Sequence, residues 1–495
     1  MKMKSLLFMA IPMALIAGCA VGPNYRRPAI SAPARWTEPL RGGETNAAAS
    51  LAAWWKNFHD SELNSLVDRA VRSNLDLRVA DARVREARAQ YGVAVGSLLP
   101  TIDASASYAR TETSHRQPVL GSIPIPAGVP FDNNLYQAGF DASWEIDVFG
   151  GKRRAMESAR ARVQASEYGR RAAWVTLLGE VARNYIDLRG RQRALAIANE
   201  NIQAQNRALA ITQDRFSKGL TSDLDVQQAA TLLATTKAEV PSLQTEIQIS
   251  IHRLGVLLGQ QPGALAAELT NAAPIPAAPP QVPVGLPSEL LLRRPDVQLA
   301  ERRLAAATAN IGAAKSDLFP KFYLTGVTGF ESISAGDWFA AGSRFWSAGP
   351  TVQWRIFDAG RIRANIRVKN ARQEEALANY EQTTLTAFED VENSLAAYAN
   401  EQIRRQSLQD AVASSRKSLD LANKLYANGL ADFLQVLDAE RSLYQTQDAL
   451  VQSDQAVSTD VISLYKSLGG GWETPSPAST SVAASNPTYS NRERF

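Results

Sequence analysis

The stretch YQAGFDASWEIDV at residues 136–148 alternates apolar and polar side chains without interruption. A period of two predicts a β-strand that has one apolar face and one polar face. The pattern recurs 210 residues later, at residues 346–356, and a shorter version occurs at residues 102–108. With the counterpart of that shorter segment, we predict four strands, at about residues 101–110, 135–149, 321–330 and 345–357.

These strands fit a membrane barrel, because they are about ten residues long and carry aromatic side chains near their ends. A strand of a soluble sandwich has the same period and remains the alternative. The side chains predicted to face lipid are Tyr136, Phe140, Trp144, Trp346 and Trp354. Four strands cannot close a barrel, so the chain must oligomerise. A dimer would fill its interior with side chains, whereas a trimer would leave a channel, and the polar inner face favours the trimer.

The chain is internally duplicated. Residues 76–100 match residues 296–320 at a spacing of 220, and later pairs such as Trp144 and Trp354 keep a spacing of 210. The predicted repeats span residues 74–259 and 294–472, and a Pro-rich linker at residues 260–293 joins them. Each repeat is predicted to contain a helix, two strands and a long helical hairpin. The tail at residues 473–495 is rich in Ser, Thr, Pro and Asn, which predicts disorder.

The hairpins are predicted from long helical patterns without proline. A helix from about Lys152 to Ser217 would be about 100 Å long, which no compact domain needs. Gly219 and Gly429 suit the ends of the first helices, and Asp223 and Asp432 open the second ones. The apolar stripe of each hairpin requires neighbours to cover it. A solitary coiled-coil scaffold is the alternative.

The first residues direct the chain out of the cytoplasm. Lys2 and Lys4 precede an apolar run at residues 6–17, so residues 1–18 are predicted to be a signal peptide. The run is too short to span a bilayer, although an uncleaved anchor is the alternative. Residues 16–19 resemble the bacterial lipobox, which implies an acylated Cys19. Ala20 follows instead of Asp, and this resemblance favours the outer membrane.

Composition excludes several classes of function. Lys and Arg number 53 against 49 Asp and Glu, a formal net charge of +4, which gives no electrostatic basis for binding nucleic acid. One Cys and three scattered His exclude an intrachain disulfide and a Cys-based zinc site. We expect no catalytic residue, no metal site and no cofactor.

Several motifs then occur in order along the chain. They are GLPSELLLRRPD at 285–296, Ala300–Glu301, Ile311–Gly312, Gly349–Pro350, Trp354, Phe357–Asp358, Gly360–Arg361, the early Gly22–Tyr25 and residues 464–472. This set resembles the outer membrane factor (TolC-like) family of bacterial tripartite efflux pumps, in its lipoprotein branch. The similarity covers nearly the whole mature chain.

The resemblance implies an all-α fold with a membrane β-barrel: a homotrimer forming a 12-stranded barrel in the outer membrane, continued by a 12-helix periplasmic α-barrel tunnel. Residues 19–73 would form a lipidated N-terminal extension and equatorial segment, and the linker a second equatorial segment. Small toxic molecules would reach the duct from a periplasmic adaptor and an inner-membrane transporter, expected to be of the RND type. An outlet for protein secretion and a structural lipoprotein without a pore are the alternatives.

The resemblance also implies a gate near the second hairpin tip. Leu434, Asp438 and Arg441 fall at i, i+4 and i+7 on one helical face, where the family has an apolar ring, an acidic ring and a basic partner. Gln435 stands where some relatives carry a second Asp, and Tyr426 matches a position that links neighbouring coiled coils. An isolated surface ion pair and ordinary packing of Tyr426 are the alternatives. The expected adaptor contacts are Lys218, Gly219, Leu220, Thr221, Asn428, Gly429, Leu430 and Ala431.

Overall fold

The computed structural model describes residues 20–39, 44–45, 51–112, 132–279 and 282–473. The predicted signal peptide, the lipidated Cys19 and nearly all of the predicted tail lie outside these residues. The chain divides into two compact units. The first contains Ala80–Gly169 and Asp296–Thr383 with the N-terminal segment to Ile30, and the second contains Ser31–Val79, Arg170–Pro295 and the chain from Thr384 onward.

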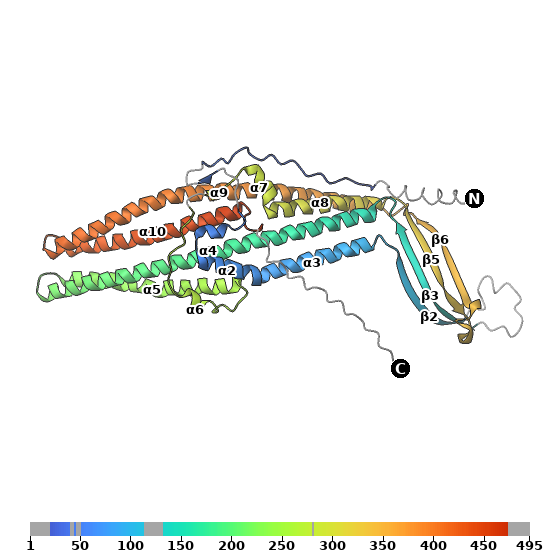
Figure 1. Ribbon diagram of the computed structural model, residues 1–495, viewed down its shortest axis with the longest axis horizontal. Coiled ribbons are helices and arrows are strands. Elements are labelled where there is room, and N and C mark those ends of the chain that lie inside the picture. Colours follow the sequence, from blue (N-terminus) through green and yellow to red (C-terminus); the bar gives the residue numbers. More distant parts are fainter. Residues whose placement is uncertain (1–19, 40–43, 46–50, 113–131, 280–281, 474–495) are drawn as a thin grey trace, which may run out of the picture. The chain divides into compact units, whose positions relative to one another are not determined.

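In the first unit, four strands form one antiparallel sheet in the order β2-β3-β5-β6 (Figure 1). Their bounds are Thr101–Glu112 for β2, Asp132–Ile146 for β3, Lys321–Ser332 for β5 and Arg344–Gln353 for β6. Two short 3-10 turns, η4 at Ala335–Asp337 and η5 at Ala341–Ser343, join β5 to β6. Each repeat thus contributes one pair of antiparallel strands, β2 with β3 and β5 with β6. The two pairs are joined where β3 pairs with β5.

Two of the predicted strands are present but end earlier than predicted. The strand predicted at 135–149 runs from Asp132 to Ile146, and the strand predicted at 345–357 runs from Arg344 to Gln353. Both end opposite the beginning of β5, where Gln353 pairs with Lys321 and Ile146 pairs with Phe322. Pro320 precedes β5 and has no backbone N–H to donate, so the alternating pattern continues after the pairing has stopped.

Two long helical hairpins follow the strands (Figure 1). The first consists of α4, Gly151–Ser217, and α5, Asp223–Leu257; the second consists of α9, Arg361–Ala427, and α10, Phe433–Ser467. Both first helices have 67 residues and both second helices have 35, as expected of a duplication. At about 1.5 Å per residue, the 67-residue helices are about 100 Å long.

The shorter elements belong to the two repeats and the segments that flank them. α3, Leu75–Gly96, and α8, Pro295–Ser316, are the equivalent helices that precede the strands. The others are β1 at Glu44–Thr45, η2 at Trp54–Phe58, α2 at Ser61–Ser73, α6 at Ala266–Leu269, β4 at Val282–Pro283 and α7 at Pro287–Arg293. β1 and β4 pair in parallel, so the N-terminal extension and the linker meet in the second unit.

The core of the second unit gathers around the aromatic side chains of η2. Trp54, Trp55 and Phe58 are buried, and the Trp54 ring stacks on Tyr465 of α10 with centroids 5.2 Å apart. Arg294, between α7 and α8, is buried in the same unit and donates to Asp390 at 2.8 Å. It also donates to the backbone carbonyl oxygens of Ala387 and Ser467, both at 3.3 Å. The RRPD motif therefore ties the linker to both helices of the second hairpin.

None of the described helices combines the length and the apolar composition needed to cross a membrane.

Candidate functional site

The sheet has two chemically different faces. Strand register places the predicted lipid-facing Tyr136, Phe140, Trp144 and Trp346 on one face. Trp354 lies just beyond the last residue of β6. We call this surface the apolar face; its further members are Ile102, Ala104, Ala106, Tyr108, Ala138, Ala142, Phe322, Leu324, Gly326, Thr328, Phe330, Ala348, Pro350 and Val352. The opposite face is mainly polar and includes Asp103, Ser105, Ser107, Gln137, Asp141, Ser143, Thr325, Glu331 and Thr351.

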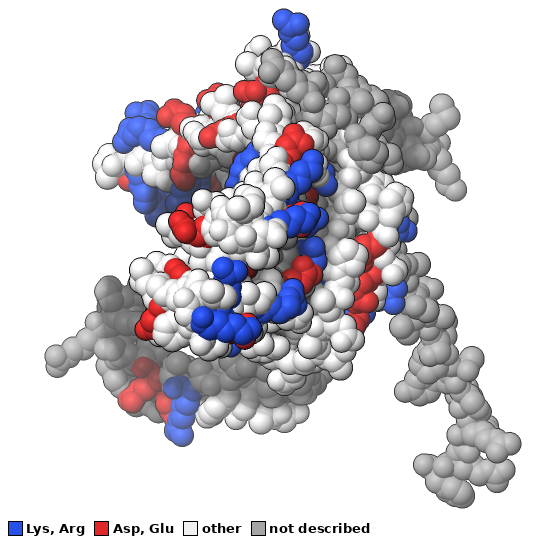
Figure 2. Space-filling view, turned by 90° about the vertical axis from the view of Figure 1, so that its left-hand side faces the viewer, with Lys and Arg blue, Asp and Glu red and all other residues white. Residues whose placement is uncertain are grey.

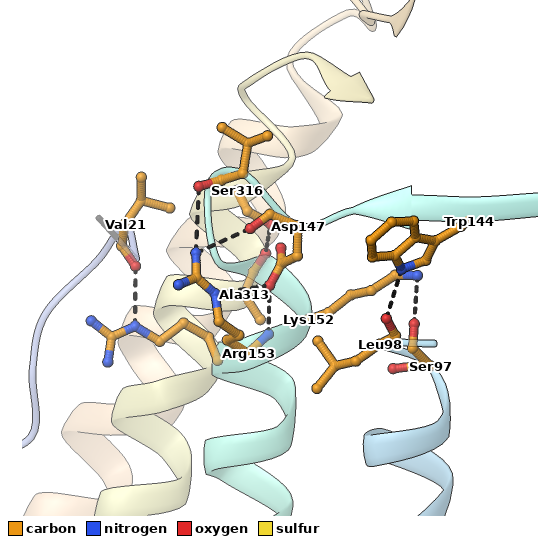
Figure 3. A network of polar contacts seen from close by, with 11 residues as sticks. Val21, Ser97, Leu98, Trp144, Asp147, Lys152, Arg153, Ala313 and Ser316 are labelled. Atoms are coloured by element: carbon orange, nitrogen blue, oxygen red, sulfur yellow. Dashed lines mark hydrogen bonds and ion pairs between the residues drawn. The ribbon is translucent and has the colours of Figure 1, made fainter. Parts of the chain in front are cut away.

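Aromatic side chains mark both ends of the apolar face. Next to the helices, the indole N–H groups of Trp144 and Trp354 donate to the carbonyl oxygens of Leu98 and Leu318, at 2.8 and 3.2 Å. The two bonds are equivalent in the two repeats, and Figure 3 shows the first of them. Such aromatic side chains with a polar group at one end are typical of membrane–water interfaces.

At the other end of the sheet, an aromatic cluster covers the strand ends. Tyr108 and Tyr136 have ring centroids 4.8 Å apart, and Trp338 lies 5.5 Å from Tyr136. Phe339 stacks on Trp338 at 4.9 Å and meets Phe330 at 5.5 Å. Eight residues separate Tyr136 from Trp144, which is about 27 Å along a strand. With the tilt of about 35–45° that strands have in membrane barrels, this length gives an apolar band about 20 Å tall, close to the band of about 25 Å that such barrels present to lipid.

Polar contacts fix the junction between β3 and α4 (Figure 3). The Asp147 carboxylate accepts from the backbone N–H of Arg153 at 2.8 Å, and the Arg153 guanidinium contacts the same carboxylate at 3.4 Å. Lys152 donates to the carbonyl oxygen of Ser97 at 2.6 Å and lies 3.3 Å from Glu145. These contacts join the end of β3 to the first turn of α4 and to the end of α3.

The N-terminal residues 20–25, which we call the N-terminal strap, bind at the same junction. The backbone N–H of Val21 donates to the carbonyl oxygen of Phe149 at 3.0 Å. Arg154 donates to Val21 at 3.3 Å and to the Asn24 side chain at 2.6 Å. A Cβ atom added to Gly22 would lie 2.4 Å from Cα of Gly312, so the two backbones cross in contact. The residue after Cys19 is thus held beside the sheet.

Tyr25 closes the strap. Its hydroxyl donates to the Glu301 carboxylate, which also accepts from Arg302, and the Arg302 guanidinium lies 5.5 Å from the Tyr25 ring centre. Burial and the Glu301 carboxylate raise the pKa of Tyr25, so its phenol stays a donor. The sequence motifs at 22–25 and 300–301 are therefore in contact in the structure. The sequence alone did not predict this contact.

The eight predicted adaptor-contact residues lie in the two hairpin turns. Gly219 and Gly429 both have φ of +71°, and the N–H groups of Leu220 and Leu430 bond to Arg215 and Leu425 at 2.9 Å. These are Schellman turns, which require the left-handed conformation that glycine adopts easily. Six of the eight residues are exposed, while Thr221 and Ala431 are half-buried. In the view toward this end, acidic and basic side chains are interspersed (Figure 2).

Four of the five predicted gate residues are exposed. Leu434 is 52% exposed, and Gln435 is also exposed. Arg441 donates to Asp438 at 2.8 Å, with both side chains more than half exposed. An exposed pair of this kind contributes only about 0–1 kcal/mol to stability. The pair therefore contributes little to folding stability.

Tyr426, the fifth gate residue, is buried inside the second hairpin. Its ring lies 5.5 Å from Phe433, and the Arg215 guanidinium lies 4.5 Å from its centre. Arg215 also donates to the Tyr426 carbonyl oxygen at 3.1 Å, so α4 and α9 are linked near their tips. Among the described residues, the buried Tyr426 hydroxyl has no hydrogen-bond partner.

One residue of this region was missed by sequence analysis. Glu440 lies on the buried face of α10 between Val436 and Leu443 and is only 6% exposed. Burial alone raises its pKa to about 7. Its spacing from Val436 and Leu443, i+4 and i−3, was the available signal, because these positions share one helical face.

Comparisons with known proteins agree with this geometry. The chain matches the model of the outer membrane efflux protein family over residues 66–260 and again over residues 286–470. It is 33% identical over 477 residues to the solvent efflux pump outer membrane protein SrpC of Pseudomonas putida, covering 95% of this chain and 99% of the relative. It is also 33% identical over 467 residues to the cation efflux system protein CusC of Escherichia coli O6:H1, covering 92% and 97% of the two chains.

A solved structure has the same fold. The outer-membrane channel OprN matches with a TM-score of 0.85 and 37% identity, covering 92% of this chain and 100% of that one. The predicted fold class is confirmed, as are the predicted outer-membrane location and the efflux function. Taken with the two family matches, these findings show that the chain belongs to the outer membrane efflux protein family.

Proposed function

We propose that three copies of the chain form the exit duct of a tripartite efflux system, which passively conducts small toxic molecules and catalyses no reaction. The observation that carries this proposal is the sheet with one apolar and one polar face. The edge strands of this sheet, β2 and β6, have no further strand partner among the described residues. An unpaired edge in lipid costs several kcal/mol for each unsatisfied backbone group, so the edges of separate copies must pair.

Three copies supply twelve strands, enough to leave a channel rather than a plugged interior. The polar face, with Asp103, Asp141 and Ser143, then lines the channel, and the apolar face meets lipid. The helical hairpins of three copies supply twelve long helices for the periplasmic tunnel. The strap brings the residue after Cys19 to the junction of sheet and helix, which supports a lipid anchor at the membrane surface.

The tips gate the tunnel in this proposal. Threefold symmetry would bring three Asp438 carboxylates and three Leu434 side chains together, with Arg441 offsetting the repulsion between carboxylates. Gln435 adds no charge to this constriction. Tyr426 supports the proposal through its buried hydroxyl, which a neighbouring coiled coil would satisfy.

The partners follow from the exposed turns. A periplasmic adaptor would contact residues 218–221 and 428–431, and its preference for separated tips would shift the gate toward the open state. An inner-membrane transporter of the RND type would deliver the cargo. The two named relatives belong to solvent and cation efflux systems, which favours small-molecule cargo over protein secretion. Growth of a deletion strain on solvents, metal ions, dyes and antibiotics would identify the cargo class.

Single-channel recording in planar bilayers tests the gate. We expect low conductance for the wild type and higher conductance for Asp438→Ala, because the mutation removes the carboxylates that close the constriction. The matched control is Asp214→Ala, which breaks an equally exposed ion pair with Lys218, 2.7 Å long, on the first hairpin. Equal conductance of Asp438→Ala and wild type would remove Asp438 from the gate, and absence of any conductance would favour a structural lipoprotein.

A further inference from the structure

A groove of about 650 Å³ opens on the apolar face of the sheet. Its floor consists of the small side chains Ala104, Ala106 and Ala138. Its walls are aromatic and consist of Phe140, Phe330, Phe339 and Trp346. We call this surface the outer groove, because its lining includes the end of β5 and the start of β6. These strand ends are the ones far from the helices (Figure 1).

The depth of the groove in the membrane follows from the strand register. Trp144 marks the helix side of the apolar band, and Phe140 and Ala138 lie about 14 and 20 Å further along β3. Tyr136 marks the outer end of the band, about 27 Å from Trp144 along the same strand, so the groove extends from the middle of the band toward its outer end. Phe339, from the connection between β5 and β6, covers the groove at its outer end through its contact with Phe330. The groove therefore faces the outer leaflet.

Arg344 supplies a charge at the outer end of this apolar groove. It is the first residue of β6, lines the groove and is exposed. No ion pair joins Arg344 to another described residue, whereas Arg110, at the outer end of β2, contacts Asp132 at 2.6 Å. A guanidinium presents several N–H donors in a plane that matches two oxygens of a phosphate. In the strand register Arg344 stands beside Phe330, two residues inside the outer end of the apolar face, and its long side chain can extend from there to the lipid headgroups. The groove thus combines an apolar channel with a phosphate-binding group at its outer end.

We propose that the outer groove binds a phosphorylated, acylated lipid of the outer leaflet. One acyl chain lies on the alanine floor between Phe140 and Trp346, and a headgroup phosphate binds Arg344. This site goes beyond the efflux duct, because it lies on the face opposite the polar channel wall. An apolar surface alone would contact acyl chains of any lipid. The guanidinium of Arg344 adds a preference for lipids with a phosphorylated headgroup.

Native mass spectrometry of the purified full-length trimer, titrated with diphosphoryl lipid A, tests the site. We expect Arg344→Ala to weaken binding by about tenfold and Arg344→Lys by less, because the lysine keeps the charge. Ala106→Phe fills the groove and should weaken binding similarly. The matched control is Arg355→Ala, an exposed arginine two residues beyond the helix-side end of the same strand, which should bind as the wild type does.

The same spectra report whether each variant is still a trimer, so a folding defect is distinguished from lost binding. Dephosphorylated lipid A should bind the wild type about as weakly as diphosphoryl lipid A binds Arg344→Ala. The proposal is overturned if the wild type and Arg344→Ala bind both lipids equally. It is also overturned if a neutral apolar dye displaces the lipid from the wild type, because the groove would then be a site for apolar solutes.

Discussion

The buried carboxyl group of Glu440 should make the second hairpin less stable as the pH rises. Its pKa is about 7 in the folded hairpin, against 4.5 for the free side chain. Between these two pKa values, the Glu440 carboxyl group is protonated in the folded state and ionised in the unfolded state. The stability that this proton provides is complete below about pH 4.5, and it is fully lost once the pH exceeds about 7.

The size of the effect follows from the difference between the two pKa values. A difference of about 2.5 units corresponds to about 3 kcal/mol, or about 300-fold in an opening equilibrium. Solvent screening does not reduce this value much, since the residue is only 6% exposed. Glu440→Gln keeps the shape and polarity of the protonated side chain and removes the titration. It should therefore match the wild type at pH 4.5 and exceed it in stability at pH 8.

Hydrogen exchange of the first turns of α10, measured by mass spectrometry on the detergent-purified trimer, is the assay. Comparing variant and wild type at the same pH cancels the intrinsic exchange rate, so the ratio reports opening alone. The ratio should be near one at pH 4.5 and rise to about 100-fold or more by pH 8. Asp420→Asn removes an exposed carboxylate of the same hairpin that pairs with Lys424 and lies outside the proposed gate, and it should change exchange by less than about fivefold at any pH. A ratio for Glu440→Gln that does not change with pH would refute the reasoning.

Two further substitutions test packing. Gly312→Ala should destabilise the protein by about 1–3 kcal/mol, because the new Cβ would lie 2.7 Å from the Val21 carbonyl oxygen, whereas Gly92→Ala at the equivalent position meets nothing within 4 Å and should be neutral or stabilising; thermal melting of the trimers compares them. Arg294→Met should cost about 1–3 kcal/mol, because it leaves the Ala387 and Ser467 carbonyl oxygens without this donor, and Arg293→Met should cost much less. Equal melting temperatures within either pair would contradict the packing described.

Sequence pattern located the strands because their two faces meet different surroundings. The alternation around Trp144 and its copy around Trp354 requires one apolar and one polar side, and the register confirms which residues share a face. The long helices could be predicted equally well, since Gly219 and Gly429 adopt the left-handed conformation that ends a helix. The ends of the strands could not be predicted, because they depend on where the partner strand begins rather than on the strand's own residues.

Contacts between segments that are far apart in the sequence could not be predicted. Tyr25 and Glu301 are 276 residues apart, and each belongs to a motif that has no visible reason to meet the other. The burial of Tyr426 has the same origin, because Arg215 reaches it from the other hairpin. The roles of Leu434, Asp438 and Arg441 in closing a tunnel depend on neighbouring copies of the chain and therefore stay predictions.

The two repeats are alike where both perform the same task and differ where only one can. Trp144 and Trp354 make the same bond to the preceding helix, because each repeat must join its strands to a helix. The chain has a single N-terminal strap, however, and of the two equivalent helices α3 and α8 it is α8 that contacts Tyr25. Glu301 and Arg302 accordingly hold Tyr25, whereas the equivalent positions in α3 are Asp81 and Ala82. Phe149 and Arg154 of the first repeat bind the start of the strap, and the second repeat alone supplies the pair that holds Tyr25.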